Sequence, residues 1–333
     1  MTTKPGAPGN SSARQTGFAI AKAFVSLALL YFLFQAYDVE AALIRVAGIE
    51  WSAFCIAAML LLASMVVATW RWHVIVAALG GNLRRRTAFA LVWIAMFFNQ
   101  ALPSNLGGDA VRIWMFYRKD GVLKRAISSV LLDRVTALVG LAILVLLTFP
   151  LAARFIDDTT ILVILAFLVA TIFVGLLAFL WLDRLMVLFN RMLPSRLFHL
   201  ITSLAENSRV VLAPSRSGPQ VLGLSITNQI LMVLVMFALA RGLSIEVEIS
   251  ALLVLIPPVI LASLLPISFA GWGVREGAMI AMLGTIDVAP ENALVLSVAF
   301  GFVILILSLP GALIWFFSDN RKGVANNSEK LEI

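Results

Sequence analysis

Charged residues, cysteine and histidine are all scarce in this chain. Of its 333 residues 13% are charged, and it contains one cysteine, Cys55, and two histidines, His73 and His199. One cysteine excludes a disulfide framework or a cysteine metal site within the chain, and two isolated histidines support neither metal-ligand spacing nor a Ser/His/Asp arrangement. The sequence also lacks the glycine-rich phosphate loop of nucleotide-hydrolysing proteins. We therefore predict no metal, no cofactor and no ATP-driven pump.

Apolar residues are abundant where charged residues are scarce. They make up 61% of the chain, which excludes an ordinary soluble domain. The net charge of +7 would fit a nucleic-acid partner, but the basic residues gather at the ends of apolar segments and so report membrane orientation. The sequence thus predicts an all-α polytopic integral membrane protein that binds no nucleic acid.

Eight apolar segments are separated by short polar stretches. They run over about Phe18–Tyr37, Trp51–Thr69, Ala88–Leu102, Ala126–Phe149, Thr160–Leu182, Gln220–Ala240, Ser250–Leu265 and Ala293–Phe317. A spanning helix needs roughly 20 residues. Six segments approach or exceed that length, whereas those that begin at Ala88 and Ser250 are short and end at polar interruptions. We expect about six full spans and two re-entrant helical hairpins, over residues 88–118 and 250–287.

The two polar interruptions repeat one pattern, 163 positions apart. The first runs from Leu102 to Arg112 and the second from Leu265 to Arg275, and both contain Leu-Pro, glycine and Val-Arg. A proline-glycine break at membrane depth must be buried in protein or line a wet cavity. A helix that restarts at such a break presents free amide groups that attract anions. We therefore interpret the two interruptions as halves of one site for a phospholipid phosphate.

Four charged residues are the main candidates for that site. Arg112 and Arg275 would bind the phosphate, and Asp109 or Glu276 would balance charge or meet a cationic headgroup. The other candidates are the glycines and polar residues of the breaks, Gly107, Gly108, Gly271, Gly273, Asn105 and Ser268, and the supporting residues Pro103, Pro266, Asp133 and Arg134. The simpler alternative is that these charges form local ion pairs that only cap half-helices.

The pair Asp133-Arg134 has no charged counterpart in the second half of the chain. The equivalent position there is Leu296. The pair is therefore also consistent with a purely structural partner of the first hairpin. Trp51, Trp70 and Trp72 stand at the ends of apolar runs, where tryptophan is typical of the membrane interface.

The distribution of basic residues predicts the topology. If both short segments are re-entrant, only Arg45, Arg154 and Arg241 lie outside, and three arginines lie at membrane depth, Arg112, Arg134 and Arg275. The other nineteen of the 25 basic residues then lie on the amino-terminal side, as expected of the cytoplasm. Each half of the chain has three spans and a hairpin, so the second half is inverted relative to the first, a plan known from transporters.

We divide the chain into four parts on this basis. Residues 1–17 form a disordered cytoplasmic tail, and residues 18–150 form the first membrane repeat with the hairpin at 88–118. Residues 151–317 form the second repeat, which contains an interfacial helix at 183–216 and the hairpin at 250–287. Residues 318–333 form a second cytoplasmic tail. A simple connector between the halves is an equally good interpretation of residues 183–216.

At the two interruptions the chain resembles the membrane domain of lysylphosphatidylglycerol synthetase and its stand-alone relatives. The matching residues are Leu102-Pro103 with Gly107-Gly108-Asp109-Ala110-Val111-Arg112, and Gly271-Trp272-Gly273-Val274-Arg275-Glu276-Gly277. The resemblance covers about Phe18 to Phe317 and implies a membrane fold that moves aminoacylated or other polar lipids between leaflets. Full-length relatives carry a soluble synthetase domain, whereas only a tail follows Ser318 here, so we expect translocation rather than synthesis.

Residues and resemblance together predict a lipid flippase in the bacterial cytoplasmic membrane, with both termini in the cytoplasm. Its partner would be a membrane lipid, and a homo-oligomer or a partner enzyme of lipid synthesis is compatible with the sequence. The alternative is a membrane enzyme or accessory subunit in lipid or glycolipid synthesis, including hopanoid or polyprenyl-linked pathways, that uses the same cavity for a transfer step.

Overall fold

Helices account for the regular structure of this protein. The computed structural model describes residues 44–46, 48–102, 107–180, 204, 206–212, 217–264 and 271–318, and within these ranges it contains α-helices, one short 3-10 helix and no strand. The predicted all-α class is confirmed. The predicted segment Phe18–Tyr37, both tails and most of the proposed interfacial helix at 183–216 lie outside the described residues.

Four of the described helices are long and apolar enough to cross a bilayer. They are α3 (Trp51–Ala78), α6 (Leu123–Phe155), α10 (Gly218–Gly242) and α13 (Pro290–Phe317), with 28, 33, 25 and 28 residues. Each contains one of the predicted apolar segments, and each exceeds the roughly 20 residues that a span requires. A further apolar helix, α7 (Thr159–Leu180), follows α6. The chain is therefore an integral membrane protein.

Two pairs of shorter helices flank the interruptions. The first pair is α4 (Arg85–Ala101) and α5 (Gly107–Asp120), and the second is α11 (Ile249–Ser263) and α12 (Val274–Leu283). The members of each pair pack against each other. In the first pair, a Cβ atom on Gly108 would lie 1.9 Å from the backbone oxygen of Ala95. Only glycine therefore permits the close approach of α5 to α4.

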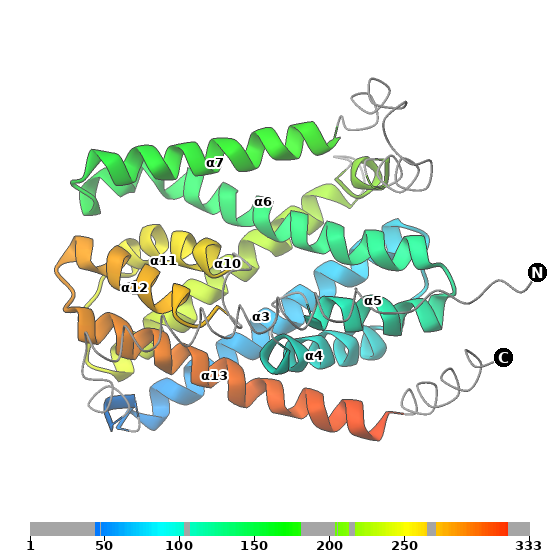
Figure 1. Cartoon of the computed structure of the whole chain (residues 1–333), viewed down its shortest axis with the longest axis horizontal. Helices are drawn as coiled ribbons and strands as arrows, with labels where there is room; N and C mark the ends of the chain where they lie inside the picture. Colours follow the sequence, from blue (N-terminus) through cyan, green and yellow to red (C-terminus); the bar gives the residue numbers. More distant parts are fainter. Residues whose placement is uncertain are drawn as a thin grey trace, which may run out of the picture.

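The chain enters the first helix pair and leaves it at the same end of the bundle. Gly81, in the turn between α3 and α4, approaches Arg125 near the start of α6, with 3.1 Å between a Cβ built on Gly81 and Arg125 Cδ. The turn that leads into α4 thus lies beside the turn that leads out of α5. In Figure 1 the α4–α5 pair lies toward the right-hand end of the molecule and the α11–α12 pair toward the left-hand end.

The opposite end of the bundle gathers the start of α3, the end of α10 and the start of α13. Arg45 Nη1 donates to Asn292 Oδ1 at 2.6 Å, and the Glu50 amide donates to the Gly242 carbonyl at 3.3 Å. The second helix pair joins the chain here, since α11 follows α10 by a short turn and α13 begins shortly after the 3-10 helix η1 (Gly284–Ile286) that follows α12.

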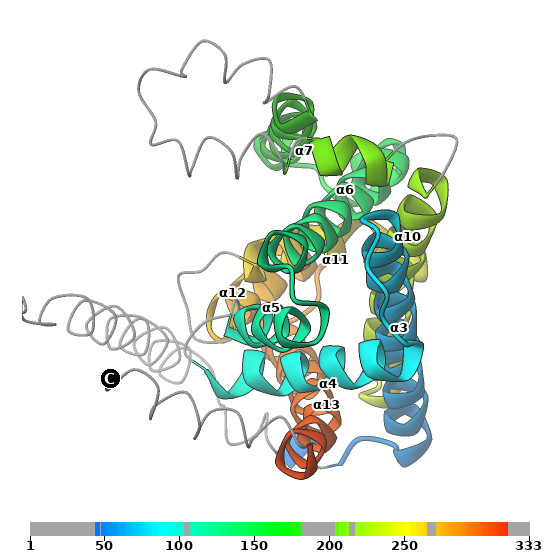
Figure 2. The same ribbon diagram turned by 90° about the vertical axis from the view of Figure 1, so that its right-hand side faces the viewer.

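The core lies among α3, α10, α11, α12 and α13. Its buried side chains are mostly aliphatic, with Leu239, Leu252 and Leu296 among them. The helices α3 and α10 run side by side in both views, and α7 lies at the edge of the molecule beyond α6 (Figures 1 and 2). Large apolar side chains on the outer faces, such as Phe167 on α7 and Leu313 on α13, stay exposed, as expected of helices that face lipid.

One prediction about the helix ends is wrong. Trp72 was expected at the membrane interface, but α3 continues to Ala78 and the Trp72 side chain is fully buried. Its indole packs edge-on against Phe116 of α5. Trp51 and Trp70, by contrast, are exposed on the surface of α3. Trp72 is thus a core residue that joins α3 to the first helix pair.

Candidate functional site

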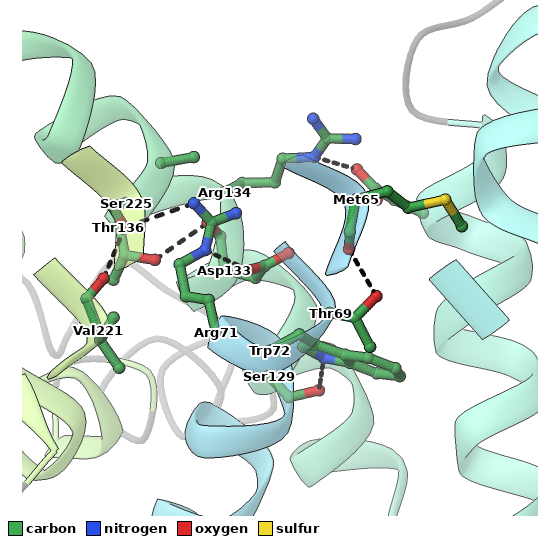
Figure 3. Close-up of polar contacts among 12 residues, drawn as sticks. Met65, Thr69, Arg71, Trp72, Ser129, Asp133, Arg134, Thr136, Val221 and Ser225 are labelled. Carbon is green, nitrogen blue, oxygen red and sulfur yellow. Dashed lines mark hydrogen bonds and ion pairs between the residues drawn. The ribbon is translucent and has the colours of Figure 1, made fainter. Parts of the chain in front are cut away.

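Two charged residues from different spanning helices meet inside the bundle. Arg71 of α3 donates from Nε to Asp133 Oδ1 of α6 at 2.8 Å, and its Nη1 lies 3.4 Å from Ser225 Oγ of α10. Figure 3 shows the Arg71 guanidinium between Asp133 and Ser225. Asp133 follows the start of α6 at Leu123 by ten residues, or roughly 15 Å along the helix axis. The contact therefore lies well inside α6 rather than at its end.

The same aspartate continues the network into α5. Arg112 donates from Nη1 to Asp133 Oδ2 at 2.9 Å and from Nη2 to Asp109 Oδ1 at 3.2 Å. Asp109 also accepts a hydrogen bond of 2.6 Å from Arg134 Nε of α6. We call these five residues, Arg71, Asp109, Arg112, Asp133 and Arg134, the α5–α6 cluster. The structure thus brings four of the predicted site residues together and adds Arg71.

The α5–α6 cluster carries more positive than negative charge. Three arginines face two aspartates, which leaves one unit of positive charge. The Arg134 side chain is 38% exposed, whereas the other four are buried. Arg112 Nε is also buried and has no hydrogen-bond partner among the described atoms. Ionisable groups inside a membrane domain are costly, so an unbalanced cluster favours a functional site over a purely structural one.

An aromatic face supports the central arginine. The Arg112 guanidinium lies over the Trp72 ring, 4.9 Å from its centroid, and the Trp72 indole Nε1 donates to Ser129 Oγ at 3.3 Å. A buried cation–π contact of this kind contributes about 2 kcal/mol. Trp72 therefore fixes the plane in which Arg112 reaches both aspartates.

The second interruption forms a smaller and neutral group. Arg275 Nη2 of α12 donates to Glu276 Oε1 at 2.7 Å, and Ser297 Oγ of α13 donates to the same oxygen at 2.9 Å. Arg275 Nε lies 3.0 Å from Ser297 Oγ. The Arg275 guanidinium lies over the Trp272 ring, 4.7 Å from its centroid. We call Arg275, Glu276 and Ser297 the α12–α13 cluster, and all three side chains are buried.

Glycines open the backbone at both interruptions. Gly271 and Gly273 adopt φ values of +82° and +87°, which side-chain-bearing residues rarely adopt. The Gly273 amide donates to Glu276 Oε2 at 2.5 Å, so Glu276 caps the helix that Gly273 starts. In the first interruption α5 begins at Gly107, and the Gly108 amide donates to Asn99 Oδ1 at 2.9 Å. Side chains of the chain itself thus bind these freed amides.

Four of the predicted site residues cannot be placed relative to the clusters. Asn105, Ser268, Pro103 and Pro266 lie outside the described residues. Within the described ranges, no hydrogen bond or ion pair joins the α5–α6 cluster to the α12–α13 cluster.

The two clusters share an arginine at equivalent positions, but their carboxylates do not correspond. Arg112 and Arg275 stand 163 positions apart, and each lies against a tryptophan face. At the same spacing Arg134 corresponds to Ser297, which contacts both Arg275 and Glu276. Comparison with Leu296 alone misses this partner, because Leu296 points into the apolar core. The second half therefore keeps a polar contact but not the extra charge.

Sequence reasoning missed Arg71, Ser225 and Ser297. Arg71 was grouped with the basic residues on the amino-terminal side, yet six apolar residues, Val74 to Leu79, follow it before the turn. An arginine with apolar sequence on both sides is the signal that places it within a span. The two serines carry no such signal, because serine is common in membrane helices and often bonds its own backbone.

Two adjacent acidic residues, Asp157 and Asp158, lie in the turn between α6 and α7. Asp158 Oδ1 accepts a hydrogen bond of 2.7 Å from the Thr160 amide at the start of α7. This hydrogen bond holds the pKa of Asp158 below its usual value. Asp158 thus caps α7, and both residues are exposed.

A bundle whose described part buries six charged side chains among membrane-length apolar helices defines a polytopic membrane protein with a polar site inside its membrane domain. The comparison with protein families agrees with this class. The chain belongs to the lysylphosphatidylglycerol synthase TM region family, whose profile matches residues 18–311. This match covers both interruptions and both clusters, and it points to a role in lipid metabolism or transport. The comparison with curated proteins gives no significant match.

Proposed function

We propose that this protein is a lipid translocase that moves a polar or aminoacylated phospholipid between the bilayer leaflets. The observation that carries the proposal is the excess positive charge of the α5–α6 cluster, deep within the bundle. A phospholipid phosphate would neutralise this charge while its acyl chains stay in the bilayer. Membrane proteins of the same family are the expected setting for such a substrate.

Arg134 and Arg112 would bind the phosphate one after the other. Arg134 is the only cluster member with substantial exposure, so it would meet the headgroup first. Arg112 has a free Nε and holds Asp109 by its longest contact, 3.2 Å, so it would exchange Asp109 for phosphate. Asp109 would then be available for the ammonium group of an aminoacylated headgroup.

The α12–α13 cluster would bind the headgroup during the other half of its passage across the membrane. Arg275 would bind phosphate and Glu276 a cationic group, as Arg112 and Asp109 do in the first half. Arg112 and Arg275 each belong to a helix with glycine at its start, and each lies over a tryptophan ring, which supports a shared role.

We further propose that the two helix pairs are re-entrant hairpins of an inverted repeat, made of residues 18–150 and 151–317. The proximity of Gly81 to Arg125 supports entry and exit of the first pair at one end. The contact of Arg45 with Asn292 supports entry of the second pair at the other end. The excess of basic residues beside the first pair would place that end, and both termini, in the cytoplasm of a bacterial cell.

A transport assay in proteoliposomes tests the proposal. We would measure the movement of a fluorescent aminoacylated phospholipid between leaflets for the wild type and for Arg134→Gln, Arg112→Ala and Arg275→Ala. A hydrogen bond to a charged group contributes about 1.5–3 kcal/mol, so we expect each variant to be about 10- to 100-fold slower. Arg154→Gln is the matched control, because Arg154 is exposed at the end of α6 and lies outside both clusters.

Two results would contradict the proposal. The first is transport at the wild-type rate by the cluster variants, provided that they insert and fold. The second is covalent alteration of the lipid by the purified wild type, which would identify an enzyme of lipid synthesis instead.

A further inference from the structure

A groove between α3 and α4 lies apart from both clusters. It has a volume of about 450 Å³ and is lined by Val66, Thr69, Trp70, His73, Arg85, Arg86 and Phe89. The lining residues of α3 follow one another at helical spacing, so they share one face of that helix. Arg71 and Trp72 point from α3 toward α6 instead. One helix therefore separates the groove from the α5–α6 cluster.

The groove changes from polar to apolar along its length. Arg85 and Arg86 stand at the first turn of α4, and His73 stands near the end of α3 that leads to it. Val66 lies two turns before His73, roughly 10 Å deeper along α3. The cationic end of the groove is thus near the end of the spanning helix, and its apolar end extends toward the middle of the membrane.

The cationic end lacks negative partners. In the described part of the chain neither Arg85 nor Arg86 forms an ion pair, and Arg85 only lies over the Trp70 ring, 5.8 Å from its centroid. Arg125, near the same end of the bundle, by comparison pairs with Asp120 at 2.8 Å. His73 Nδ1 is buried and has no hydrogen-bond partner. Two cations without an ion-pair partner thus line the groove, and His73 lines it beside them.

We propose that this groove binds one anionic phospholipid of the leaflet at the α3–α4 turn. Arg85 and Arg86 bind its phosphate at the end of the groove that His73 also lines. One acyl chain lies along Val66 and Phe89. The gradient of the lining matches a lipid, because free phosphate would leave the apolar half empty. The site does not depend on transport and would stabilise the packing of α4 on α3.

Lipid binding to the full-length protein in nanodiscs or detergent tests the site. We would measure the affinity for phosphatidylglycerol and phosphatidylcholine by native mass spectrometry and by the shift in melting temperature. Basic residues near an anionic lipid each contribute a factor of about five, so the double variant Arg85→Gln/Arg86→Gln should bind phosphatidylglycerol roughly 25-fold more weakly. Its weak binding of phosphatidylcholine should not change.

The control removes the same charge elsewhere. Arg118→Gln/Lys119→Gln alters two exposed residues at the end of α5, where Arg118 lies over Trp114 as Arg85 lies over Trp70. Neither control residue lines the groove. We expect this variant to retain nearly wild-type affinity, because neither residue lines the space in which the phosphate would bind.

A second variant tests the groove without changing charge. Val66→Trp would fill the apolar end, and it should weaken phosphatidylglycerol binding while both arginines remain. Val66 is exposed, so folding should tolerate the change. Three results would overturn the proposal: equal affinity of the wild type for both lipids, equal effects of the two double variants, or full competition by inorganic phosphate with no effect of Val66→Trp. If the wild-type protein binds lipid in the groove but does not transport lipid, the result would contradict only the proposed translocase.

Discussion

At the scale of single residues, Asp133 is the centre of the charged network. It accepts hydrogen bonds from Arg71 and Arg112, which come from α3 and α5. Its own helix supplies Arg134, which binds Asp109 instead. One carboxylate therefore connects two helices to a third, and its loss would leave two buried guanidinium groups without their main acceptor.

We predict that Asp133→Asn strongly destabilises the protein. Breaking a buried ion pair by removing one partner costs about 3–5 kcal/mol, because the remaining charge is uncompensated. The melting temperature in detergent should fall clearly. The control is Asp157→Asn, which removes an exposed carboxylate in the turn before α7 and should leave the melting temperature unchanged. Equal melting temperatures for both variants would show that the network does not stabilise the fold.

At the scale of elements, the close packing of α4 and α5 depends on one glycine. Any side chain at Gly108 would overlap the backbone of Ala95. The same helix carries Asp109 and Arg112, one and four positions after Gly108. The distance between α4 and α5 therefore sets the positions of both side chains relative to Asp133. The geometry of the cluster therefore depends on the contact between two short helices.

We predict opposite effects for two glycine substitutions. Gly108→Ala should destabilise the protein by about 1–3 kcal/mol, since α5 must move away from α4. Gly277→Ala in α12 should stabilise it by about 0.4–1 kcal/mol, because no atom lies within 4 Å of the added Cβ and the unfolded chain loses freedom. Thermal unfolding of both variants measures the difference, and a stabilising Gly108→Ala would refute the described contact.

At the scale of the whole molecule, the sequence predicted the four spans that the structure shows and the short helices beside the two interruptions. Long apolar runs determine membrane helices directly, and the proline-glycine breaks stand out against them. The partners of the charged residues could not be predicted in the same way. Arg71 and Ser225 are 154 positions apart, and their contact follows from the packing of α3 on α10 rather than from any local pattern. Hydropathy also does not reveal which face of a helix is buried, as Trp72 shows.

The proposed topology predicts the sides from which single cysteines react. With the exposed native thiol removed by Cys55→Ser, a cysteine at Lys119 should react only from the cytoplasm, and one at Asp287 only from outside. A membrane-impermeant maleimide applied to intact cells and to inverted vesicles makes the comparison. Reaction of the Lys119→Cys protein in intact cells would exclude the re-entrant arrangement of α4 and α5.

The unequal count of arginines and aspartates has an electrical consequence. A single charge that crosses the membrane potential gains or loses about 2.3 kcal/mol per 100 mV. In the proposed mechanism, the empty α5–α6 cluster carries one positive charge, and a bound phospholipid with one net negative charge cancels it. Rearrangement with lipid would then be insensitive to voltage, whereas the return of the empty site would respond to it. A membrane potential would thereby bias the direction of the transport cycle without hydrolysis of a nucleotide.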